Sequence, residues 1–346
     1  MHAARYAASL LIIAPAGGPI LERMTLKRGW RSGRLNDVYS IFPMIRDQIR
    51  LWGTVFAALL GLAFGSFLNV CLSRWPEGES IVTPRSHCRK CGRVLNWWEN
   101  VPLVSWLALR GRCRGCGTRI SVRYVFVEAT VGGLWAVAAF QALPLIQNLV
   151  ALDSFPIRWI EIDALHLFGN LVLIWLLVAL MFLDAEHLWL PDKLTLPGIL
   201  IGFLFRVADF SLNHSLSFQR SDAIPSLLTT LLLQILSILA AAALILLIRW
   251  VYWLVRRREG IGLGDAKLMA LLAAWLGLPG ALLAFAIGIV VGAVIALVVI
   301  SLPRAPDGES RALLKLPLGT FLCIGGIVSA LWGQPILAAY LRWAGL

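Results

Sequence analysis

The stretch IPSLLTTLLLQILSILAAAALILLIRWVYWLV, residues Ile224–Val255, decides the fold class of this chain. A membrane-spanning helix needs about 20 mostly apolar residues. This stretch is longer than that, so we expect the helix to be tilted or partly interfacial. The whole chain has the same character, because 59% of its 346 residues are hydrophobic and only 14% are charged. Soluble domains carry about 25% charged residues. The sequence therefore predicts an all-α polytopic membrane protein, solvated by lipid.

Apolar stretches on both sides of this one bring the predicted number of transmembrane helices to about eight. One is a shorter helix that forms a returning pair with the span after it. The small-residue run GLAFGS (Gly61–Ser66) in the first span suits close helix packing. The predicted helices are Leu51–Leu72, Val125–Leu145, Leu165–Leu183, Leu194–Phe210, Ile224–Val255, Ala266–Leu276, Ala281–Leu302 and Leu318–Leu341.

The charges of the loops predict the orientation of these helices. The loops at 73–124, 184–193, 256–265 and 303–316 fall on one face, and three of the four are net basic. Lys and Arg collect in cytoplasmic loops of membrane proteins. We therefore expect this face to be cytoplasmic, in a multi-pass membrane protein. The same rule accounts for the net charge of +12. No nucleic-acid-binding motif accompanies that charge, so we expect no nucleic-acid partner.

Residues 1–50 do not fit the pattern of the rest. They hold eight Arg and Lys against three acids, although the first span would place them outside. The apolar segment Ala7–Ile13 is too short to span and would be a poor signal sequence. We expect residues 1–50 to be an extension that is disordered or not native, with Met24 and Met44 as alternative starts. The organisation then continues with the first helix at 51–72, a cytoplasmic domain at 73–124 and a membrane-embedded domain at 125–346.

Two aspartates lie at the predicted cytoplasmic ends of helices. Asp184 follows a span in FLDAEHLWLPDKLTLPG, and Asp265 follows a glycine-rich turn in GIGLGDAKL. Carboxyl groups at membrane depth are costly and usually functional. Two carboxyls in one site cannot both ionise easily, so one can donate a proton to a carbonyl while the other takes one from water. Gly262 and Gly264 would let the chain bend and a substrate backbone approach. The pair predicts an aspartic endopeptidase.

Each aspartate also has a purely structural interpretation. Asp265 alone could be a helix N-cap, and Asp184 alone could be a helix-end residue. Asp192, in LPDK, is the competing acid near Asp184, and its position after a proline suits a turn or cap. We therefore expect Asp192 to shape the site. Glu186 and His187 are close enough to tune it, but we expect a solvated loop role for both.

Four of the six cysteines form two closely spaced pairs. Cys88-x2-Cys91 and Cys113-x2-Cys116 follow the spacing of a zinc site. Four thiolates suit tetrahedral zinc, and a closed all-cysteine site is structural. The alternative is a redox pair, but disulfides are rare in the cytoplasm. The sequence predicts a zinc-ribbon-like subdomain after the first helix. Cys71 and Cys323 lie in apolar stretches and are expected to be buried and inert.

Six motifs, taken in order, resemble those of the type IV prepilin peptidases, or prepilin leader peptidases, of the GxGD type. The resemblance extends from about Leu51 to the C-terminus. The motifs are GLAFGSFLNVCLSRWP (Gly61–Pro76), NWWENVPLVSWLALRGRCRGC (Asn96–Cys116) with the double CxxC, RYVFVEA (Arg123–Ala129), LDAEHLWLPDKLTLP (Leu183–Pro197), GIGLGDAKLMALLAAWLG (Gly260–Gly277) and LPLGTFLCIGG (Leu316–Gly326).

The resemblance implies an eight-helix bundle in which Asp184 and Asp265 are catalytic. It implies prepilins, or the pseudopilins of type II secretion, as substrates, cleaved after a glycine behind a short basic leader. It also implies N-methylation of the new N-terminus from S-adenosylmethionine, for which the residues themselves reveal no cofactor loop.

Two functions of other classes stay open, a proton-coupled transporter with membrane carboxylates and a scaffold with a zinc module. Transporters often show inverted repeats with broken helices at the midplane, and none is visible here.

Overall fold

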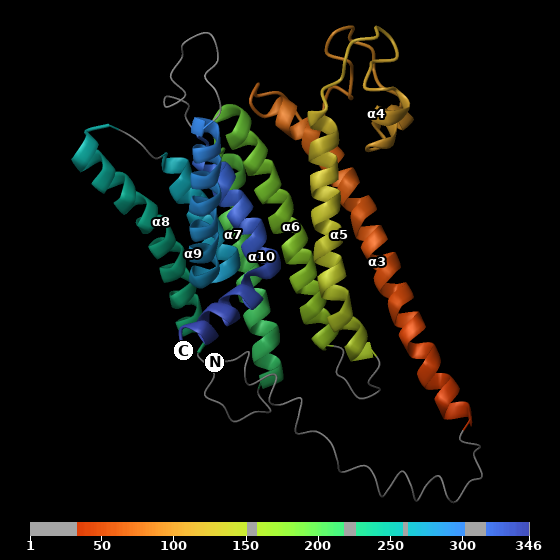
Figure 1. The fold of residues 1–346 in the computed structure, drawn as a ribbon, viewed down its shortest axis with the longest axis vertical. Coiled ribbons are helices and arrows are strands. Elements are labelled where there is room, and N and C mark those ends of the chain that lie inside the picture. Colours follow the sequence, from red (N-terminus) through yellow and green to blue (C-terminus); the bar gives the residue numbers. More distant parts are fainter. Residues whose placement is uncertain (1–32, 151–157, 218–225, 259–261, 302–315, 346) are drawn as a thin grey trace, which may run out of the picture. The chain divides into compact units, whose positions relative to one another are not determined.

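The computed structural model describes residues 33–150, 158–217, 226–258, 262–301 and 316–345. The regular structure of these residues is helical, apart from two isolated β-bridges in the cysteine-rich segment. Seven of their helices are long and apolar enough to cross a membrane. Figure 1 shows these helices and the small cysteine-rich segment between α3 and α5. The predicted class, an all-α multi-pass membrane protein with a small subdomain after the first helix, is confirmed.

The described residues divide into two compact units. Residues 33–52 and 334–345 belong to one unit, and the described part of 53–333 forms the other. Helix α3 (Gly33–Arg74) begins upstream of the predicted start at Leu51, because its polar flank continues the helix beyond the apolar span. The part long and apolar enough to cross a membrane is Asp47–Arg74. Residues 1–32 of the expected extension lie outside the described residues.

The middle of the chain forms a series of long helices, α5 (Arg123–Val150), α6 (Arg158–His187), α7 (Asp192–Ser217) and α8 (Leu227–Arg256). Most extend beyond the predicted spans into polar flanks, as helices do outside the hydrocarbon core. Helix α6 packs between α5 and α7. It ends where Leu188 adopts a left-handed conformation (φ 50°) and donates its N–H to the Asp184 carbonyl. This sharp stop fixes Asp184 in the last turn.

Helix α9 (Leu263–Ser301) joins the two helices that the sequence predicts at 266–276 and 281–302. The predicted break between them is confirmed, because Gly277 leaves helical geometry and the two halves of α9 meet at a kink. Gly277 there has φ 71° and ψ 174°, and Pro279 follows inside the helix. Glycine tolerates this conformation, and proline supplies no N–H to the preceding turn. The segment before the kink is almost entirely buried, against α7 and α8 among others.

Glycines let the helix backbones approach closely. A Cβ on Gly325 of α10 (Leu318–Trp343) would lie 2.0 Å from the Ala284 carbonyl oxygen of α9. A Cβ on Gly65 of α3 would lie 2.7 Å from Cα of Glu128 in α5. The predicted role of Gly61–Ser66 in close packing is confirmed. In lipid such contacts, rather than hydrophobic exclusion from water, drive helix association.

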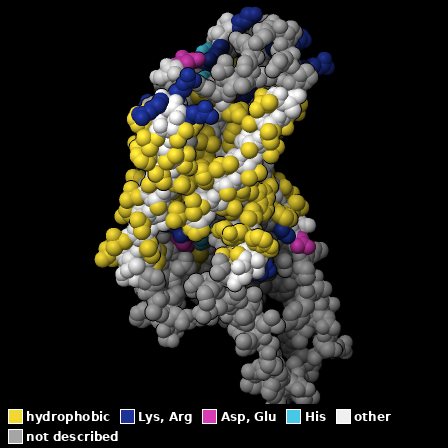
Figure 2. All heavy atoms as spheres, turned by 60° about the vertical axis from the view of Figure 1, so that its left-hand side comes forward, with side chains coloured by type: hydrophobic (Ala, Val, Ile, Leu, Met, Phe, Trp, Pro, Cys, Tyr) yellow, Lys and Arg dark blue, Asp and Glu magenta, His cyan; other side chains and the backbone are white. Residues whose placement is uncertain are grey.

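Apolar side chains face both the interior and the surroundings. The core is built mainly from α6 and α9, with α3, α5 and α10 around them. Figure 2 shows that hydrophobic side chains also cover the visible face of the helices, with Lys and Arg gathered toward its ends. An apolar exterior suits lipid, while the charged ends suit the two aqueous interfaces.

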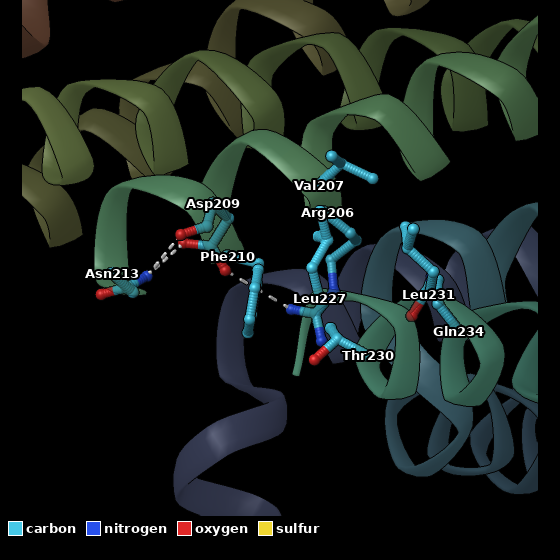
Figure 3. A pocket seen from close by; sticks show the side chains of 9 residues that line it. All are labelled: Arg206, Val207, Asp209, Phe210, Asn213, Leu227, Thr230, Leu231 and Gln234. Atoms are coloured by element: carbon cyan, nitrogen blue, oxygen red, sulfur yellow. Dashed lines mark hydrogen bonds and ion pairs between the residues drawn. The ribbon is translucent and has the colours of Figure 1, made fainter. Parts of the chain in front are cut away.

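A polar cluster lies at the end of the α6–α7 pair remote from Asp184. Asp209 of α7 pairs with His166 of α6 and contacts Arg206. Gln234 of α8 donates to the carbonyls of Ala273 and Ala274, just before the kink in α9. Figure 3 shows Arg206, Asp209 and Gln234 lining one pocket. This end of the helices is therefore tied together by polar contacts.

Candidate active site and four-cysteine module

The two predicted aspartates are both buried. Asp184 lies in the last turn of α6 and is 6% exposed, and Asp265 is the third residue of α9 and is 8% exposed. Neither carboxyl has an ion-pair partner among the residues that the structure describes. A buried carboxylate without a cation costs several kcal/mol of stability. Such a cost usually persists at functional sites.

Helix α10 supplies the hydrogen bonds that hold Asp184. The backbone N–H of Thr320 donates to Asp184 Oδ2 at 2.6 Å. The Thr320 hydroxyl lies 3.1 Å from the same oxygen and 3.2 Å from the Met181 carbonyl, so it can donate to either. A Cβ on Gly319 would lie 2.9 Å from Asp184 Cγ. Only glycine at 319 allows the α10 backbone to approach the carboxyl this closely.

Asp265 is held by the start of its own helix. The N–H of Gly262 donates to Asp265 Oδ2 at 3.2 Å. Asp265 therefore stands three residues after the capping position and reaches back to it, as the acid of a capping box does. The alternative that Asp265 is itself the N-cap is wrong. The helix dipole favours a negative charge at this position.

The two glycines before Asp265 play different parts. A Cβ on Gly264 would lie 3.1 Å from Leu190 Cβ, so Gly264 lets the start of α9 pack closely against the α6–α7 turn. A Cβ on Gly262 would meet only ordinary contacts. Neither glycine has a positive φ. Gly264 therefore serves close packing, while the bend expected at these glycines stays a prediction.

Leu190 connects the two aspartates. Its side chain packs against Gly264, the residue before Asp265. Its Cδ1 also lies 3.0 Å from where a Cβ on Gly319 would stand, beside Asp184. The Asp184 and Asp265 carboxyls are close enough for their charges to interact. The structure thus brings together two side chains separated by 81 residues of sequence.

Asp192 lies beside this pair but is engaged elsewhere. It is the first residue of α7 and is exposed, and Lys267 Nζ of α9 donates to its Oδ1. The pair ties the start of α7 to the start of α9. Thr195, at the same turn, donates its N–H and hydroxyl to the Pro191 carbonyl. The structure therefore supports Asp192 as an organiser of this turn.

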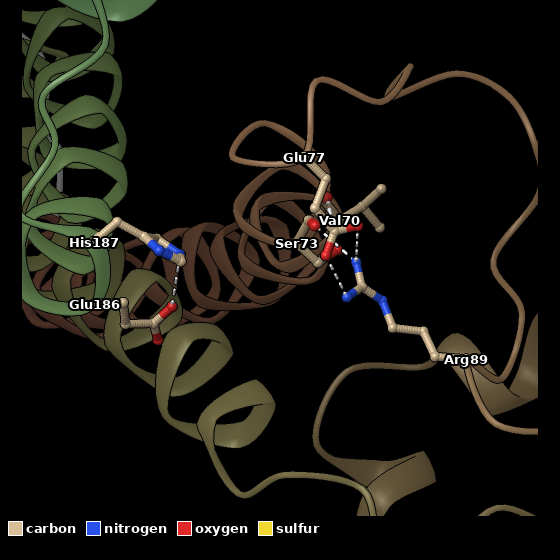
Figure 4. A network of polar contacts seen from close by, with 6 residues as sticks. All are labelled: Val70, Ser73, Glu77, Arg89, Glu186 and His187. Carbon is tan, nitrogen blue, oxygen red and sulfur yellow. Dashed lines mark hydrogen bonds and ion pairs between the residues drawn. The ribbon is translucent and has the colours of Figure 1, made fainter.

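The last turn of α6 is joined to the start of α5. Arg123 Nε lies 2.8 Å from Glu186 Oε1, and His187 Nε2 lies 3.8 Å from the other oxygen of that carboxylate. Figure 4 shows Glu186 and His187 side by side. Glu186 is exposed, but it lies in the last turn of α6 rather than in a loop and is paired with Arg123. The ion pair connects Asp184's turn to the helix that follows the cysteine-rich segment.

The four predicted cysteines converge on one point. The sulfurs of Cys88, Cys91, Cys113 and Cys116 all lie within 4.8 Å of one another, and Cys88 Sγ is 3.8 Å from Cys116 Sγ. Tetrahedral zinc with Zn–S bonds of about 2.3 Å requires sulfurs about 3.8 Å apart. The backbone N–H groups of Cys116 and Gly115 lower the pKa of the Cys113 thiol to about 6, which favours the metal-binding thiolate. The group can hold a metal ion.

Each CxxC pair forms a tight knuckle. Gly92 and Gly117, just after the second cysteine of each pair, both have φ 70°. A backbone bridge closes each knuckle, from His87 to Val94 and from Arg112 to Arg119. Glycine suits these left-handed positions because it has no Cβ. The ribbon-like geometry expected from the spacing is confirmed.

Ion pairs secure this four-cysteine module, residues 73–124. Arg89 lies 2.9 Å from Glu77 and also donates to the Ser73 carbonyl, next to the end of α3 (Figure 4). Arg93 donates to Glu99 at 2.6 Å, at the short helix η1 (Trp97–Asn100). The hydrogen bonds from Arg93 and from the Asn96 N–H lower the pKa of the Glu99 carboxyl. Glu99 therefore stays charged near neutral pH and holds the side chain of Arg93, two residues after Cys91.

Reasoning from the sequence missed three residues of the site, Leu190, Gly319 and Thr320. Gly319 and Thr320 lie in the motif LPLGTF, which carries part of the family resemblance. Nothing in the composition of that motif links it to Asp184, which lies 136 residues before Thr320. The only available signal was that this motif is one of the six that resemble the family.

Fold and site together define a multi-pass membrane protein with a buried carboxyl pair at one end of its helices and a four-cysteine module beside its first helix. Residues 59–142 match the model of the bacterial peptidase A24 N-terminal domain, and residues 171–297 match that of the type IV leader peptidase family. The chain belongs to the type IV leader peptidase family, as its motifs predicted.

Curated relatives agree with the family match, and several carry the name prepilin leader peptidase/N-methyltransferase. The one from Stutzerimonas stutzeri is 32% identical over 84% of this chain and 94% of its own length. The one from Xanthomonas campestris is 34% identical over 87% of this chain and 98% of its own. The one from Myxococcus xanthus is 41% identical over 66% of this chain and 58% of its own. No solved structure was found to match the chain.

Proposed function

We propose that this protein is a membrane aspartic endopeptidase that removes the leaders of type IV prepilins or type II secretion pseudopilins. Asp184 and Asp265 are the catalytic residues of this proposal. The observation that supports it is the convergence of two buried carboxyls, from α6 and α9, without an ion-pair partner in the described part of the chain. The names of the relatives supply the substrate class.

In the proposed mechanism the two carboxyls share the work of general acid and general base. One carboxylate takes a proton from water, whose oxygen attacks the scissile carbonyl. The other, protonated carboxyl donates to the carbonyl oxygen, and collapse of the intermediate breaks the C–N bond as the amine gains a proton. Thr320 and the Gly262 N–H keep the two carboxyls in place. Because the pair acts as a unit, neither aspartate is assigned one role.

The orientation of the site belongs to the same proposal. The turns at 184–193 and 262–265 meet at the end of α5 that carries Arg123 and the module. The module segment 73–124 has ten Arg and Lys against three Glu. Basic segments stay on the cytoplasmic side. We therefore place the active site at the cytoplasmic face of the bacterial inner membrane.

Replacing each aspartate tests the peptidase proposal. The protein and a prepilin are co-expressed, and leader removal is followed by the shift in prepilin mass. Asp184→Asn and Asp265→Asn should each abolish leader removal, because asparagine neither takes nor gives the proton. Asp47→Asn, a change at an exposed position in the first span, is the matched control and should process normally. Processing that survives in either site variant would show that the pair is not the catalytic dyad.

The module is proposed to bind one structural zinc ion. Its four thiolates would hold the ion and supply stability to a segment too small to bury its own core. Metal analysis of the purified protein should find about one zinc per chain, as one four-thiolate site requires. A Cys88→Ser/Cys91→Ser double variant should lose the zinc, while Cys71→Ala, at a buried cysteine outside the module, should keep it. An active, metal-free wild type would refute this proposal.

A second activity, N-methylation of the new N-terminus from S-adenosylmethionine, is proposed because the relatives' printed name includes N-methyltransferase. The transporter alternative lacks comparable support. The carboxyls lie at the ends of helices rather than at mid-membrane, and the family match names a peptidase.

A further inference from the structure

The short helix α4 (Val104–Ala108) of the four-cysteine module has two faces of different character. Trp106 faces the module, because its indole N–H donates to the Ile120 carbonyl at 3.3 Å. Val104 and Leu107 are 61% and 65% exposed. Residues three apart lie on the same side of a helix, so these two apolar side chains form one exposed stripe. The proposed peptidase mechanism does not use this stripe.

A hydrogen bond to α5 fixes the depth of α4 relative to the membrane spans. The N–H of Leu103, the residue before α4, donates to the buried Glu128 carboxylate at 2.8 Å. Glu128 lies five residues after the start of the apolar span Arg123–Ala142. A helix rises about 1.5 Å per residue, so α4 begins roughly 7.5 Å inside this end of the span. Figure 1 shows α4 beside the start of α5. The stripe therefore lies at the depth of the lipid headgroups.

The surroundings of the stripe are those of a membrane interface. Trp97 of η1, which packs against α4, is 78% exposed. Arg110 and Arg112, which follow α4 directly, are exposed as well. Phe126 on α5, two residues before Glu128, is 63% exposed at nearly the same depth. Tryptophan concentrates where a membrane protein meets the headgroups, and basic side chains there attract anionic lipid.

A lipid surface accounts for this combination of features. Interfacial helices bury an apolar face about 5–10 Å into the boundary between headgroups and acyl chains. A stripe of two apolar residues is too small to bind a membrane by itself. The module is tethered at both ends, however, because α3 ends at Arg74 and α5 begins at Arg123. Tethering raises the effective concentration of lipid at the stripe, so a small apolar contact suffices.

We propose that α4 is an interfacial anchor, which inserts Val104 and Leu107 into the lipid of the same membrane while Arg110 contacts anionic headgroups. The inference depends on neither the proposed peptidase activity nor the proposed methylation. The anchor holds the module against the bilayer beside the start of α5. Arg123 at that start pairs with Glu186, in the helix turn that carries Asp184. The anchored module therefore lies at the end of the helices that holds the aspartate pair.

Photocrosslinking to lipid tests the anchor. The full chain, with benzoylphenylalanine at one position, is reconstituted into vesicles of equal parts phosphatidylcholine and phosphatidylglycerol, and one of the two lipids is radiolabelled. Leu107→benzoylphenylalanine should take up radiolabel on irradiation. Val104→benzoylphenylalanine, on the same stripe, should repeat the result, so the test does not depend on one variant. Trp106→benzoylphenylalanine is the matched control, since it carries a side chain of similar size on the opposite face of α4 and should take up no lipid.

The choice of radiolabelled lipid tests the charge preference. Phosphatidylglycerol should be taken up about fivefold more than phosphatidylcholine, the effect of one basic side chain near the surface. Equal uptake of the two lipids would overturn the assigned contact with anionic headgroups.

Two further outcomes would overturn the anchor itself. One is the absence of lipid uptake at both 104 and 107 in variants that melt at the temperature of the wild type. The other is a crosslink to protein in place of lipid. A band of twice the mass would then assign the stripe to a contact with a second copy of the chain, and a crosslink to an added prepilin peptide would assign it to the substrate.

Discussion

The aspartates at the two ends of the α6–α7 pair differ in their partners, half-buried Asp209 at one end and buried Asp184 with Asp265 at the other. At one end Asp209 has three partners, with His166 Nε2 at 3.0 Å, Asn213 Nδ2 at 2.8 Å and Arg206 at 3.9 Å. At the other end Asp184 and Asp265 accept hydrogen bonds from Thr320 and Gly262, and no salt bridge is found for them among the described residues. Even Lys267, two residues after Asp265, pairs with Asp192 instead.

The difference separates a structural role from a chemical one. A compensated carboxylate such as Asp209 contributes to the stability of the helix pair. An uncompensated pair lowers stability and keeps its oxygens available for water and a substrate carbonyl. Burial alone therefore does not identify an active site in a membrane protein. Burial without a counter-charge is the more informative observation.

The largest expected contrast is in the rate of leader cleavage. Asp265→Asn should lower the rate by at least about a hundredfold, the lower limit for loss of general acid–base catalysis. Asp209→Asn should keep most of the rate, because its polar cluster lies at the far end of the helices. Purified variants and a prepilin peptide in detergent give both rates. Equal losses of cleavage rate in the two variants would show that Asp209 matters for catalysis as much as Asp265 does.

The next contrast concerns stability and has opposite signs. Asp209→Ala should lower the free energy of unfolding by about 1–3 kcal/mol, because it removes charge-assisted hydrogen bonds and strands His166. Asp265→Ala should leave it unchanged or raise it, because it removes an uncompensated carboxyl. Thermal unfolding in one detergent compares the two. A similar destabilisation by both changes would mean that Asp265 also serves the fold.

Thr320→Val tests how much the Thr320 hydroxyl contributes to holding the Asp184 carboxyl. The change removes the hydroxyl at 3.1 Å from Asp184 but keeps the backbone N–H at 2.6 Å. One neutral hydrogen bond is worth about 1 kcal/mol, so cleavage should slow by about three- to tenfold. Thr320→Ser is the matched control, since it restores the hydroxyl and should recover most of the rate. A serine variant as slow as the valine variant would assign the effect to packing.

Sequence reasoning reached the parts of this site that depend on local pattern. The four cysteines follow from their spacing, and Asp184 and Asp265 follow from charge at the ends of apolar stretches. The contacts that complete the site are long-range. Thr320 lies 136 residues from Asp184, and no periodicity or spacing links them. The break at Gly277 also follows from local pattern, because glycine and proline interrupt the helix there.

The smallest expected effect tests whether Asp192 is an organiser of the site or a member of the dyad. Its pair with Lys267 is exposed on both sides, at 57% and 37% of the side chains, and such pairs contribute about 0–1 kcal/mol. Asp192→Asn and Lys267→Met should therefore each slow cleavage by less than about fivefold. In the double variant the effects should fall short of additive, because both changes remove the same contact. Complete loss of cleavage in Asp192→Asn, while Lys267→Met stays active, would contradict this expectation. That result would show that Asp192 is one of the two catalytic aspartates, in place of Asp184 or Asp265.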